Sequence, residues 1–168
     1  MSCVATYGRQ RQSQTNWCWA AVAASVKEHY SPGAAITQCS VASTAFSPTD
    51  CCASPSSCNL SYNLQSALLS LGHMSGVPAS TAPPFTKCDN EVETLDQPIG
   101  VRIQWAGCTR GHFIAITGVS NKHLQRLVVE DPDYGQVIIE HLTMKSSYQS
   151  NPRSTPIGSW DRTYFTKR

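Results

Sequence analysis

Cys18 lies where a helix is expected to begin, a position at which a thiol can become a reactive thiolate. Residues 17–30 are rich in alanine and predict a helix, with Thr15 or Asn16 as its N-cap and residues 31–33 as its stop. The positive end of the helix dipole and the free N–H groups there favour an anion. Cys18 is therefore a candidate nucleophile. The alternative is a small buried residue or one half of a disulfide.

Nucleophilic cysteine chemistry needs a base that takes or shares the thiol proton, and His112 is the candidate. It follows Gly111 and opens the apolar run 113–119, so it would lie at the mouth of a buried strand. His29 falls inside the first predicted helix. Three further histidines lie among turn or amphipathic residues without a nearby orienting carboxylate: His73, His123 and His141. The alternative for His112 is a strand-edge histidine whose ring binds the backbone.

A carboxylate is needed to orient the imidazole, and Asp131 is the preferred candidate. If the strand of His112 and the next strand form an antiparallel hairpin, His112 and Asp131 lie at the same end of the sheet. Pro132 biases Asp131 towards an extended conformation. Glu130 would point to the opposite face, and Asp133 lies within the turn, which makes it the second choice.

The donor to a developing oxyanion should approach from just upstream of the nucleophile. Gln12 lies six residues before Cys18, and Gln10 and Gln14 are the competing amides. Because the segment is rich in glutamine, a solvated polar segment is the alternative interpretation.

The elements that must position these residues change character midway along the chain. Helices are expected first, at residues 17–30, 37–45 and 62–71. Strands are expected later, at residues 98–105, 112–119, 124–129 and 136–140. The segment 72–86 is rich in proline, serine and threonine and would cross between the two halves. This order predicts an α+β fold with an antiparallel sheet.

The length, charge and cysteine content of the chain exclude several classes of protein. The chain has 168 residues, which suits one domain, and its formal net charge of +2 leaves no basic footprint for nucleic acid. No stretch approaches the roughly 20 apolar residues of a membrane span. Eight cysteines favour an oxidising destination. The N-terminus lacks the apolar core of a secretory signal, so we expect either a leader that has been removed or export by another route.

Four segments together resemble the papain-like cysteine peptidases. These are residues 12–21, 111–119, 129–135 and 159–165. The resemblance spans residues 10–165 and is greatest to the short bacterial branch, which includes double-glycine leader peptidases of bacteriocin exporters and effector proteases of plant pathogens.

The resemblance implies a fold and a set of roles. It implies a single two-lobed domain over residues 1–168, with a helical lobe at about 12–75 that carries the nucleophile and a sheet lobe at about 86–168 that carries the histidine and aspartate. Four positions match the family's functional residues: Gln12 as oxyanion donor, Cys18 as nucleophile, His112 as base and then acid, and Asp131 as the orienting group.

The sequence also departs from papain itself. Asn16-Trp17 precedes the nucleophile where papain has a Cys-Gly-Ser type lead, and His112 follows Cys18 by only 94 positions. The third member is an aspartate rather than an asparagine. Papain's specificity pockets are therefore not transferred to this chain.

The remaining cysteines predict disulfides. Four lie within 20 residues: Cys39, Cys51, Cys52 and Cys58. A bond between the neighbours Cys51 and Cys52 would be strained, so one should pair with Cys39 and the other with Cys58. A zinc site is the rival, but the spacings are not those of paired Cys-x-x-Cys motifs.

A third bridge is expected between Cys88 and Cys108, which flank the first predicted strand. With Cys18 free, an odd number of cysteines remains, so Cys3 is expected to stay unpaired.

These inferences converge on a cysteine endopeptidase that acts on protein or peptide substrates. We expect a monomer without metal or cofactor, secreted or delivered outside the cytoplasm as an effector. Trp17, Trp19 and Trp105 could line a cleft or be buried between the lobes. The alternatives are a cysteine amidase on peptidoglycan or isopeptide bonds, and an inactive papain-like binding module.

Overall fold

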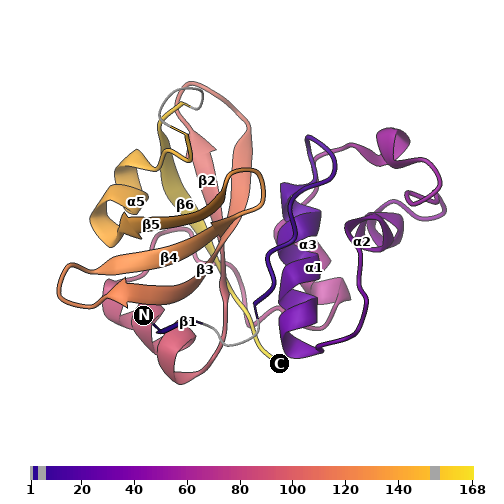
Figure 1. Cartoon of the computed structure of the whole chain (residues 1–168). Coiled ribbons are helices and arrows are strands. Elements are labelled where there is room, and N and C mark those ends of the chain that lie inside the picture. The colour runs from indigo at the N-terminus through magenta and orange to yellow at the C-terminus, as the bar shows by residue number, and fades with distance from the viewer. Residues whose placement is uncertain (1, 4–6, 152–155) are drawn as a thin grey trace.

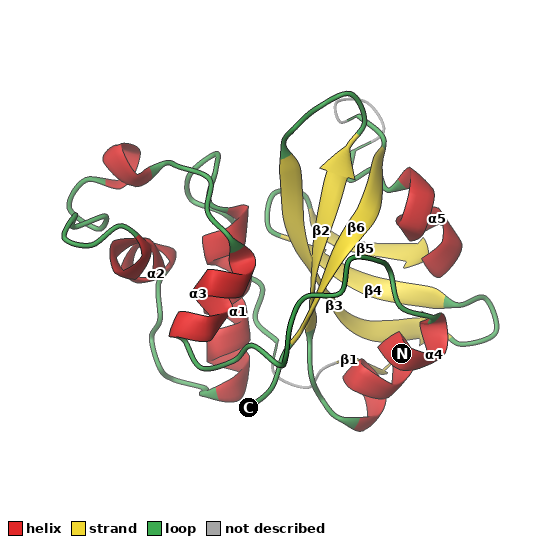
Figure 2. Ribbon diagram, turned by 180° about the vertical axis from the view of Figure 1, so that it is seen from behind, coloured by secondary structure: helices red, strands yellow, loops and turns green. Residues whose placement is uncertain are grey.

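The computed structural model describes residues 7–151 and 156–168, and the backbone of residues 2–3. The helical lobe comes first, with α1 (Cys18–Tyr30), α2 (Gln38–Ala45), a short 3₁₀ turn η1 (Pro55–Cys58) and α3 (Leu64–Ser70). Figures 1 and 2 show these helices gathered beside the sheet rather than on top of it.

The sheet lobe holds the rest of the chain. Its helical elements are α4 (Phe85–Asp89), the π-helical η2 (Asn90–Thr94) and α5 (His141–Ser147). Its strands are β1 (Ser2–Cys3), β2 (Ile99–Trp105), β3 (Gly111–Asn121), β4 (Arg126–Asp131), β5 (Gly135–Glu140) and β6 (Gly158–Phe165). Five strands follow the antiparallel order β5-β4-β3-β2-β6, and β1 pairs with β3. The fold is α+β, as the sequence predicts.

The antiparallel pairing of β3 with β4 confirms the predicted hairpin. Ala115 of β3 lies opposite Glu130 of β4, so the start of β3 and the end of β4 share one end of the sheet. On the other side of β3, His112 lies opposite Ile103 of β2. The sheet therefore carries His112 and Asp131 at the end that faces the helical lobe, as Figure 1 shows for the strands themselves.

Helix α1 is buried on nearly all sides because small residues let its neighbours approach closely. Ala20, Ala21, Ala23 and Ala24 are each fully buried, and α1 packs against α2, α3 and β3. The alanine-rich sequence thus predicts both the helix and its central place. A second core of aliphatic side chains fills the sheet lobe.

The sequence prediction differs from the structure at several elements. Helix α1 begins at Cys18 with Trp17 at the N-cap position and no side-chain cap, so neither Thr15 nor Asn16 caps it. The side chain of Asn16 instead donates to the carbonyl of Asn59, at 2.8 Å. The short elements α4, η2, α5, β1 and β6 were not predicted, because they are held by tertiary contacts more than by a periodic pattern.

Two disulfides tie down the segment after α2. Cys39 is bonded to Cys52, and Cys51 to Cys58. Each of the neighbours Cys51 and Cys52 pairs outward, as predicted. The four sulfurs are bonded to one another in pairs, which contradicts the rival zinc assignment.

The predicted bridge between Cys88 and Cys108 is wrong, since both are free thiols. Their positions explain why. Helix α4, which carries Cys88, is tied to the turn after β3 by an ion pair between Asp89 and Lys122, at 2.8 Å. Cys108 lies in the turn before β3, and a strand of this length separates its ends by roughly 3.3 Å per residue. The expectation for Cys3 concerns a side chain outside the described residues.

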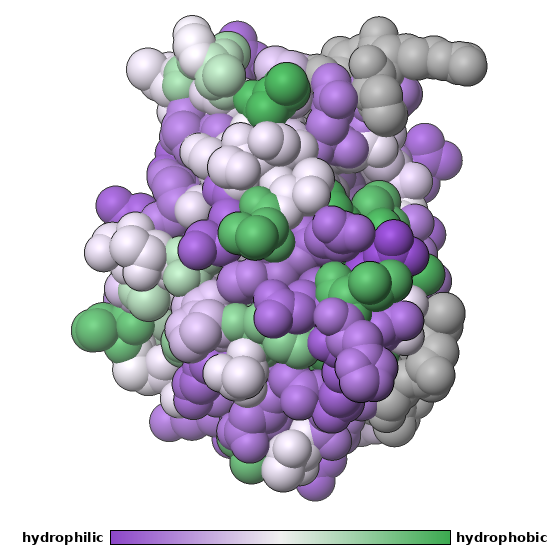
Figure 3. All heavy atoms as spheres, turned by 90° about the vertical axis from the view of Figure 1, so that its left-hand side faces the viewer, coloured by the Kyte–Doolittle hydropathy of each residue, from purple (hydrophilic) through white to green (hydrophobic). Residues whose placement is uncertain are grey.

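The surface offers no membrane-spanning element within the part of the chain that the structure describes, because no described helix is long and apolar enough. Figure 3 shows the outer face of the sheet lobe as mostly hydrophilic, with apolar side chains in separate spots. Such scattered exposure of single apolar side chains is ordinary for a protein surface.

Candidate active site

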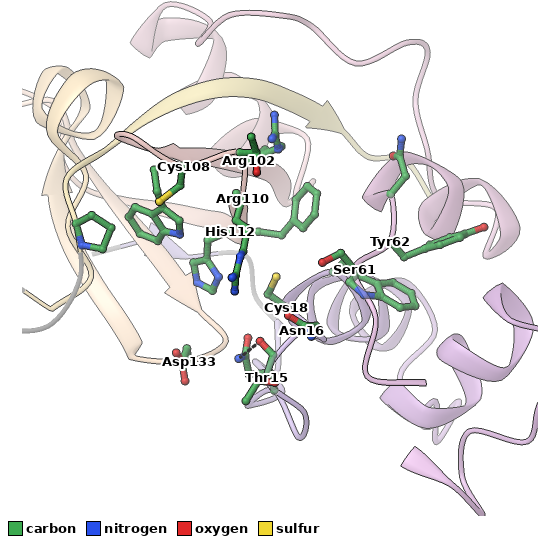
Figure 4. Close-up of a pocket in the computed structure, with 18 of the residues that line it drawn as sticks. Thr15, Asn16, Cys18, Ser61, Tyr62, Arg102, Cys108, Arg110, His112 and Asp133 are labelled. Atoms are coloured by element: carbon green, nitrogen blue, oxygen red, sulfur yellow. Dashed lines mark hydrogen bonds between the residues drawn. The ribbon is translucent and has the colours of Figure 1, made fainter. Parts of the chain in front are cut away.

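The structure brings Cys18, His112 and Asp131 together where the two lobes meet. Cys18 is the first residue of α1, and His112 is the second residue of β3. Figure 4 shows the thiol of Cys18 and the imidazole of His112 facing one another. The Nε2 atom of His112 lies 2.8 Å from Oδ1 of Asp131, which leaves Nδ1 as the ring nitrogen for the thiol. A thiol, an imidazole and a carboxylate therefore lie next to one another in that order.

Asp131 is fully buried and saturated with hydrogen-bond donors. Besides His112, its Oδ1 accepts the backbone N–H groups of Asp133 at 2.8 Å and Tyr134 at 3.2 Å. Its Oδ2 accepts the hydroxyls of Tyr148 at 2.8 Å and Ser150 at 2.7 Å. A buried carboxylate costs little only when it is paired and hydrogen-bonded in this way.

These contacts shift the pKa values of the buried pair in opposite directions. Burial alone would lower the pKa of His112, but the hydrogen bonds to Asp131 and Cys18 raise it to about 10. Burial alone would raise the pKa of Asp131, but the hydrogen bonds from His112, Ser150 and the Asp133 backbone lower it to about 2. The charged forms, imidazolium and carboxylate, are therefore favoured near neutral pH.

Aromatic rings shield this hydrogen-bonded pair. The indole of Trp105 is stacked on His112, with ring centroids 5.9 Å apart and planes 18° apart. Trp105 also contacts Tyr148, whose hydroxyl holds Asp131. The stack limits the rotation of the imidazole and keeps water from the bond between His112 and Asp131.

Asp133, the second choice for the orienting group, makes no side-chain hydrogen bond to His112. Its backbone N–H donates to Asp131, and the residue lies on the wall of the cleft. Asp133 therefore supports the site through its backbone N–H, which holds the carboxylate of Asp131.

Gln12 is the one of the three candidate glutamines that lines the cleft. Its backbone N–H donates to the carbonyl of Pro132 at 2.9 Å, which ties the segment before α1 to the turn after β4. Its side-chain Nε2 makes only a long contact of 3.4 Å with the carbonyl of Thr15, and its Oε1 is buried without a partner. Gln10 is used elsewhere, since its side chain donates to the Ile36 carbonyl.

The N-terminus of α1 is held by the segment that the disulfides fix. Cys58 accepts the indole N–H of Trp17 at 2.7 Å, and Leu60 accepts that of Trp19 at 3.1 Å. Asn59 accepts the backbone N–H of Asn16 at 2.9 Å. The segment 58–60 therefore holds the start of α1 in place through hydrogen bonds.

A cleft of about 920 Å³ lies over Cys18 and His112. Both lobes contribute to it, and Figure 4 shows Ser61 and Tyr62 on the helical side and Arg102 and Cys108 on the sheet side. Of the three tryptophans predicted as possible lining, Trp19 and Trp105 line it. Trp17 is packed in the core of the helical lobe.

Three residues that support the site could not be predicted from the sequence. Tyr148 and Ser150 reach Asp131 from the segment after α5, which carries no motif. Asn59 reaches the start of α1 from a loop whose path depends on the disulfides. No local signal in the sequence marks these residues, since each acts through a contact distant along the chain.

A thiol at the start of the helical lobe's central helix, facing an imidazole on an antiparallel sheet, defines the class of papain-like cysteine peptidases. Within that class, the family model described as papain-like cysteine protease AvrRpt2 matches residues 3–152, and the chain belongs to that family. The protein is a papain-like cysteine protease, a hydrolase. No curated protein matches the chain.

Proposed function

We propose that the protein is an endopeptidase that cleaves peptide bonds through Cys18, His112 and Asp131. The observation that carries this proposal is the placement of the Cys18 thiol facing His112, whose imidazole is hydrogen-bonded to the buried carboxylate of Asp131. The elevated pKa of His112 supports an imidazolium beside the sulfur, the form that stabilises a thiolate.

In the first step, the Cys18 thiolate attacks the carbonyl carbon of the scissile bond. The C=O π electrons move to the oxygen, which becomes an oxyanion. The backbone N–H of Cys18 and the side-chain amide of Gln12 would stabilise it. The absence of a side-chain cap at the start of α1 supports this role for the main chain.

In the second step, the imidazolium of His112 protonates the leaving amine as the C–N bond breaks, and a thioester to Cys18 remains. Water then attacks the thioester carbonyl, and His112 accepts its proton. The C–S bond breaks, so that the carboxylic acid leaves and the thiolate–imidazolium pair is restored. Asp131 holds the ring orientation throughout and stabilises the imidazolium.

We further propose that the two lobes form a single peptidase domain with boundaries near residues 12–75 and 86–168. The two disulfides support a protein that works in an oxidising compartment or is delivered there, as an exported effector would be.

The function is tested with wild type, Cys18→Ala and the matched control Cys108→Ala, which removes a different free thiol at the cleft. Each is incubated with a proteome-derived peptide library, and the new termini are sequenced. We expect the same cleavages from wild type and Cys108→Ala, and none from Cys18→Ala with its melting temperature kept.

Purified sacculi and an isopeptide-linked substrate are run beside the library. Release from these alone, with no peptide cleaved, would assign the chemistry to an amidase instead. Failure of wild type to react with an iodoacetamide or epoxide probe at Cys18 would point to a binding module.

A further inference from the structure

Arg110 is a cleft residue that the proposed mechanism does not use. It immediately precedes Gly111 and His112, and its carbonyl accepts a hydrogen bond from the Gln104 side chain at 3.1 Å and a weaker one from the Trp105 backbone at 3.4 Å. The backbone of Arg110 is thus fixed while the side chain is exposed in the cleft. Figure 4 shows that side chain extending beside His112 into the space between the sheet and α1.

The other arginine of the cleft is already neutralised. Arg102 donates to Asp161 at 2.5 Å and to the Gln104 side chain at 2.6 Å. Gly111 makes room for it, because a Cβ there would lie 2.7 Å from the Arg102 Nε. The guanidinium of Arg102 is therefore occupied by partners within the wall of the cleft.

Arg110 differs from Arg102 in having no such partner. Within the described part of the chain, its guanidinium forms no hydrogen bond or ion pair, whereas Arg9, Arg102 and Arg126 each pair with a carboxylate. Among the described residues that line the cleft, Asp133 alone carries a carboxylate, and Figure 4 draws it on the opposite side of His112 from Arg102. The wall at Arg110 thus presents an uncompensated positive charge.

We propose that Arg110 determines specificity by binding a substrate carboxylate close to the scissile bond. This inference rests on the proposed peptidase function and narrows its substrates to peptides that are acidic beside the cleavage site. The planar guanidinium has donors in a fork that matches a carboxylate bidentately. Because the backbone of Arg110 is fixed beside His112, the bound carboxylate would lie within a few residues of the attacked carbonyl.

A carboxylate in that position has two sources, the side chain of a glutamate or aspartate and the free C-terminus of a short peptide. Binding of a side chain would give an endopeptidase with an acidic preference. Binding of the terminus would give preferential removal of C-terminal residues. The experiment separates the two.

The first arm measures binding, so that it does not depend on turnover. Cys18→Ala and Cys18→Ala/Arg110→Gln are titrated with peptides from the library, in which glutamate replaces glutamine at one position at a time beside the cleaved bond. We expect glutamate at one position to tighten binding to Cys18→Ala by about two- to fivefold, the range for a solvent-exposed ion pair. The gain should vanish with Arg110→Gln and shrink in high salt.

The matched control is Arg126→Gln, which removes one positive charge far from the cleft, where Arg126 pairs with Glu140. It should keep the glutamate preference in full. Equal binding of the glutamate and glutamine peptides by Cys18→Ala, with no preference for a free C-terminus over its amide either, would overturn the proposal, and so would a preference that survives Arg110→Gln.

The second arm compares the same peptides as free acids and as C-terminal amides. A preference for the free acid that is lost with Arg110→Gln assigns the site to a peptide terminus, and a preference for internal glutamate assigns it to a side chain. In turnover assays, Arg110→Gln should still cleave the glutamine peptide. Loss of all cleavage by wild type, with the binding preference intact, would refute the peptidase function and leave the carboxylate site standing.

Discussion

The Nε2 atom of His112 lies 2.8 Å from the Oδ1 atom of Asp131, a residue whose two carboxylate oxygens accept five hydrogen bonds in all. Four of the donors come from outside β3, from the turn after β4 and from the segment after α5. The orientation of His112 therefore depends on two further parts of the sheet lobe, both of which hold Asp131 by hydrogen bonds.

Replacing Asp131 separates its charge from its geometry. In Asp131→Asn the amide oxygen can still accept from His112, and the Tyr148 hydroxyl can turn to accept from the new NH₂ group. We expect this variant to fold and to lose up to about 10⁴-fold in kcat, as an aspartate-to-asparagine change at an orienting position does elsewhere, and Asp131→Ala should lose at least as much. Asp131→Ala should also melt lower, because it leaves buried donors unpaired.

Asp133→Asn is the matched control for these kinetics. Asp133 supports the site through its backbone N–H, which the substitution keeps. A loss of kcat in Asp133→Asn as large as that in Asp131→Asn would contradict the assignment of the orienting role to Asp131.

The pKa shifts predict how stability depends on pH. The folded-state pKa of His112 is raised from 6.5 to about 10, so its contribution to stability is complete below pH 6.5 and is lost as pH rises towards 10. The folded-state pKa of Asp131 is lowered from 3.8 to about 2, so its contribution is complete above pH 3.8 and is lost as pH falls towards 2. Both contributions are complete between pH 3.8 and 6.5.

Melting temperatures measured across pH check this window, and activity should fall on the alkaline side as His112 loses its proton. NMR titration of the imidazole provides a direct test. Because the neighbouring Cys18 helps to raise the pKa of His112, that pKa should be lower in Cys18→Ala than in wild type. An unchanged His112 pKa in Cys18→Ala would contradict the thiol–imidazole contact.

Much of the site could be predicted from the sequence because its signals are local. The alanine-rich run predicts α1 and places Cys18 at its start, and a hairpin predicts that the ends of β3 and β4 lie together. The predicted N-cap is wrong because the side chain and backbone N–H of Asn16 both bind Asn59 instead of capping α1.

The remaining errors have the same physical cause, which is distance along the chain. The bridge between Cys88 and Cys108 was inferred from their flanking of one strand, but α4 packs at the far end of β3 from the turn of Cys108. Likewise, Tyr148 supports Asp131 from a segment whose position depends on its pairing with Gly158 of β6. Neither relation leaves a periodic or compositional signal.

Reduction of the disulfides should weaken substrate binding as well as stability. The bond between Cys51 and Cys58 anchors the segment 58–60, which holds the start of α1. Ser61 and Tyr62 of the cleft wall follow this segment directly. Replacing both cysteines by serine should cost about 2–3 kcal/mol of unfolding free energy for a loop of this size. We expect KM to rise and kcat to fall together, since the cleft wall is displaced and the start of α1, which carries Cys18, loses its support. Steady-state kinetics of the double variant, beside one lacking both Cys39 and Cys52, measure the two parameters.

The three free thiols within the described residues should differ in reactivity. Burial raises the pKa of the Cys88 thiol to about 12, so Cys88 should resist alkylation in the native protein. Cys108 is exposed, whereas Cys18 is buried and faces His112. Iodoacetamide at pH 6, read by peptide mass spectrometry, should modify Cys18 first, because the adjacent imidazolium stabilises its thiolate. His112→Ala should remove that advantage, and Cys108 would then react as fast or faster.

Gly158 allows the close packing behind Trp105, so Gly158→Ala should disturb the site without touching it. A Cβ at Gly158 would clash with the Cγ2 of Ile103 and lie 2.7 Å from the Cε3 of Trp105. The backbone of Gly158 cannot move away freely, because it exchanges two hydrogen bonds with Tyr148, at 2.8 and 2.9 Å. We expect a loss of about 1–3 kcal/mol in unfolding free energy, as for other overpacked cores. Since Trp105 stacks on His112 and Tyr148 holds Asp131, kcat should fall together with stability.

The control for this variant is Gly8→Ala, where a Cβ would meet no atom within 4 Å. It should leave both melting temperature and kcat unchanged. Wild-type kcat in Gly158→Ala, measured well below its melting temperature, would show that the position of the Trp105 ring does not matter to His112. A loss of kcat with little loss of stability would instead show that the ring moves while the core adapts.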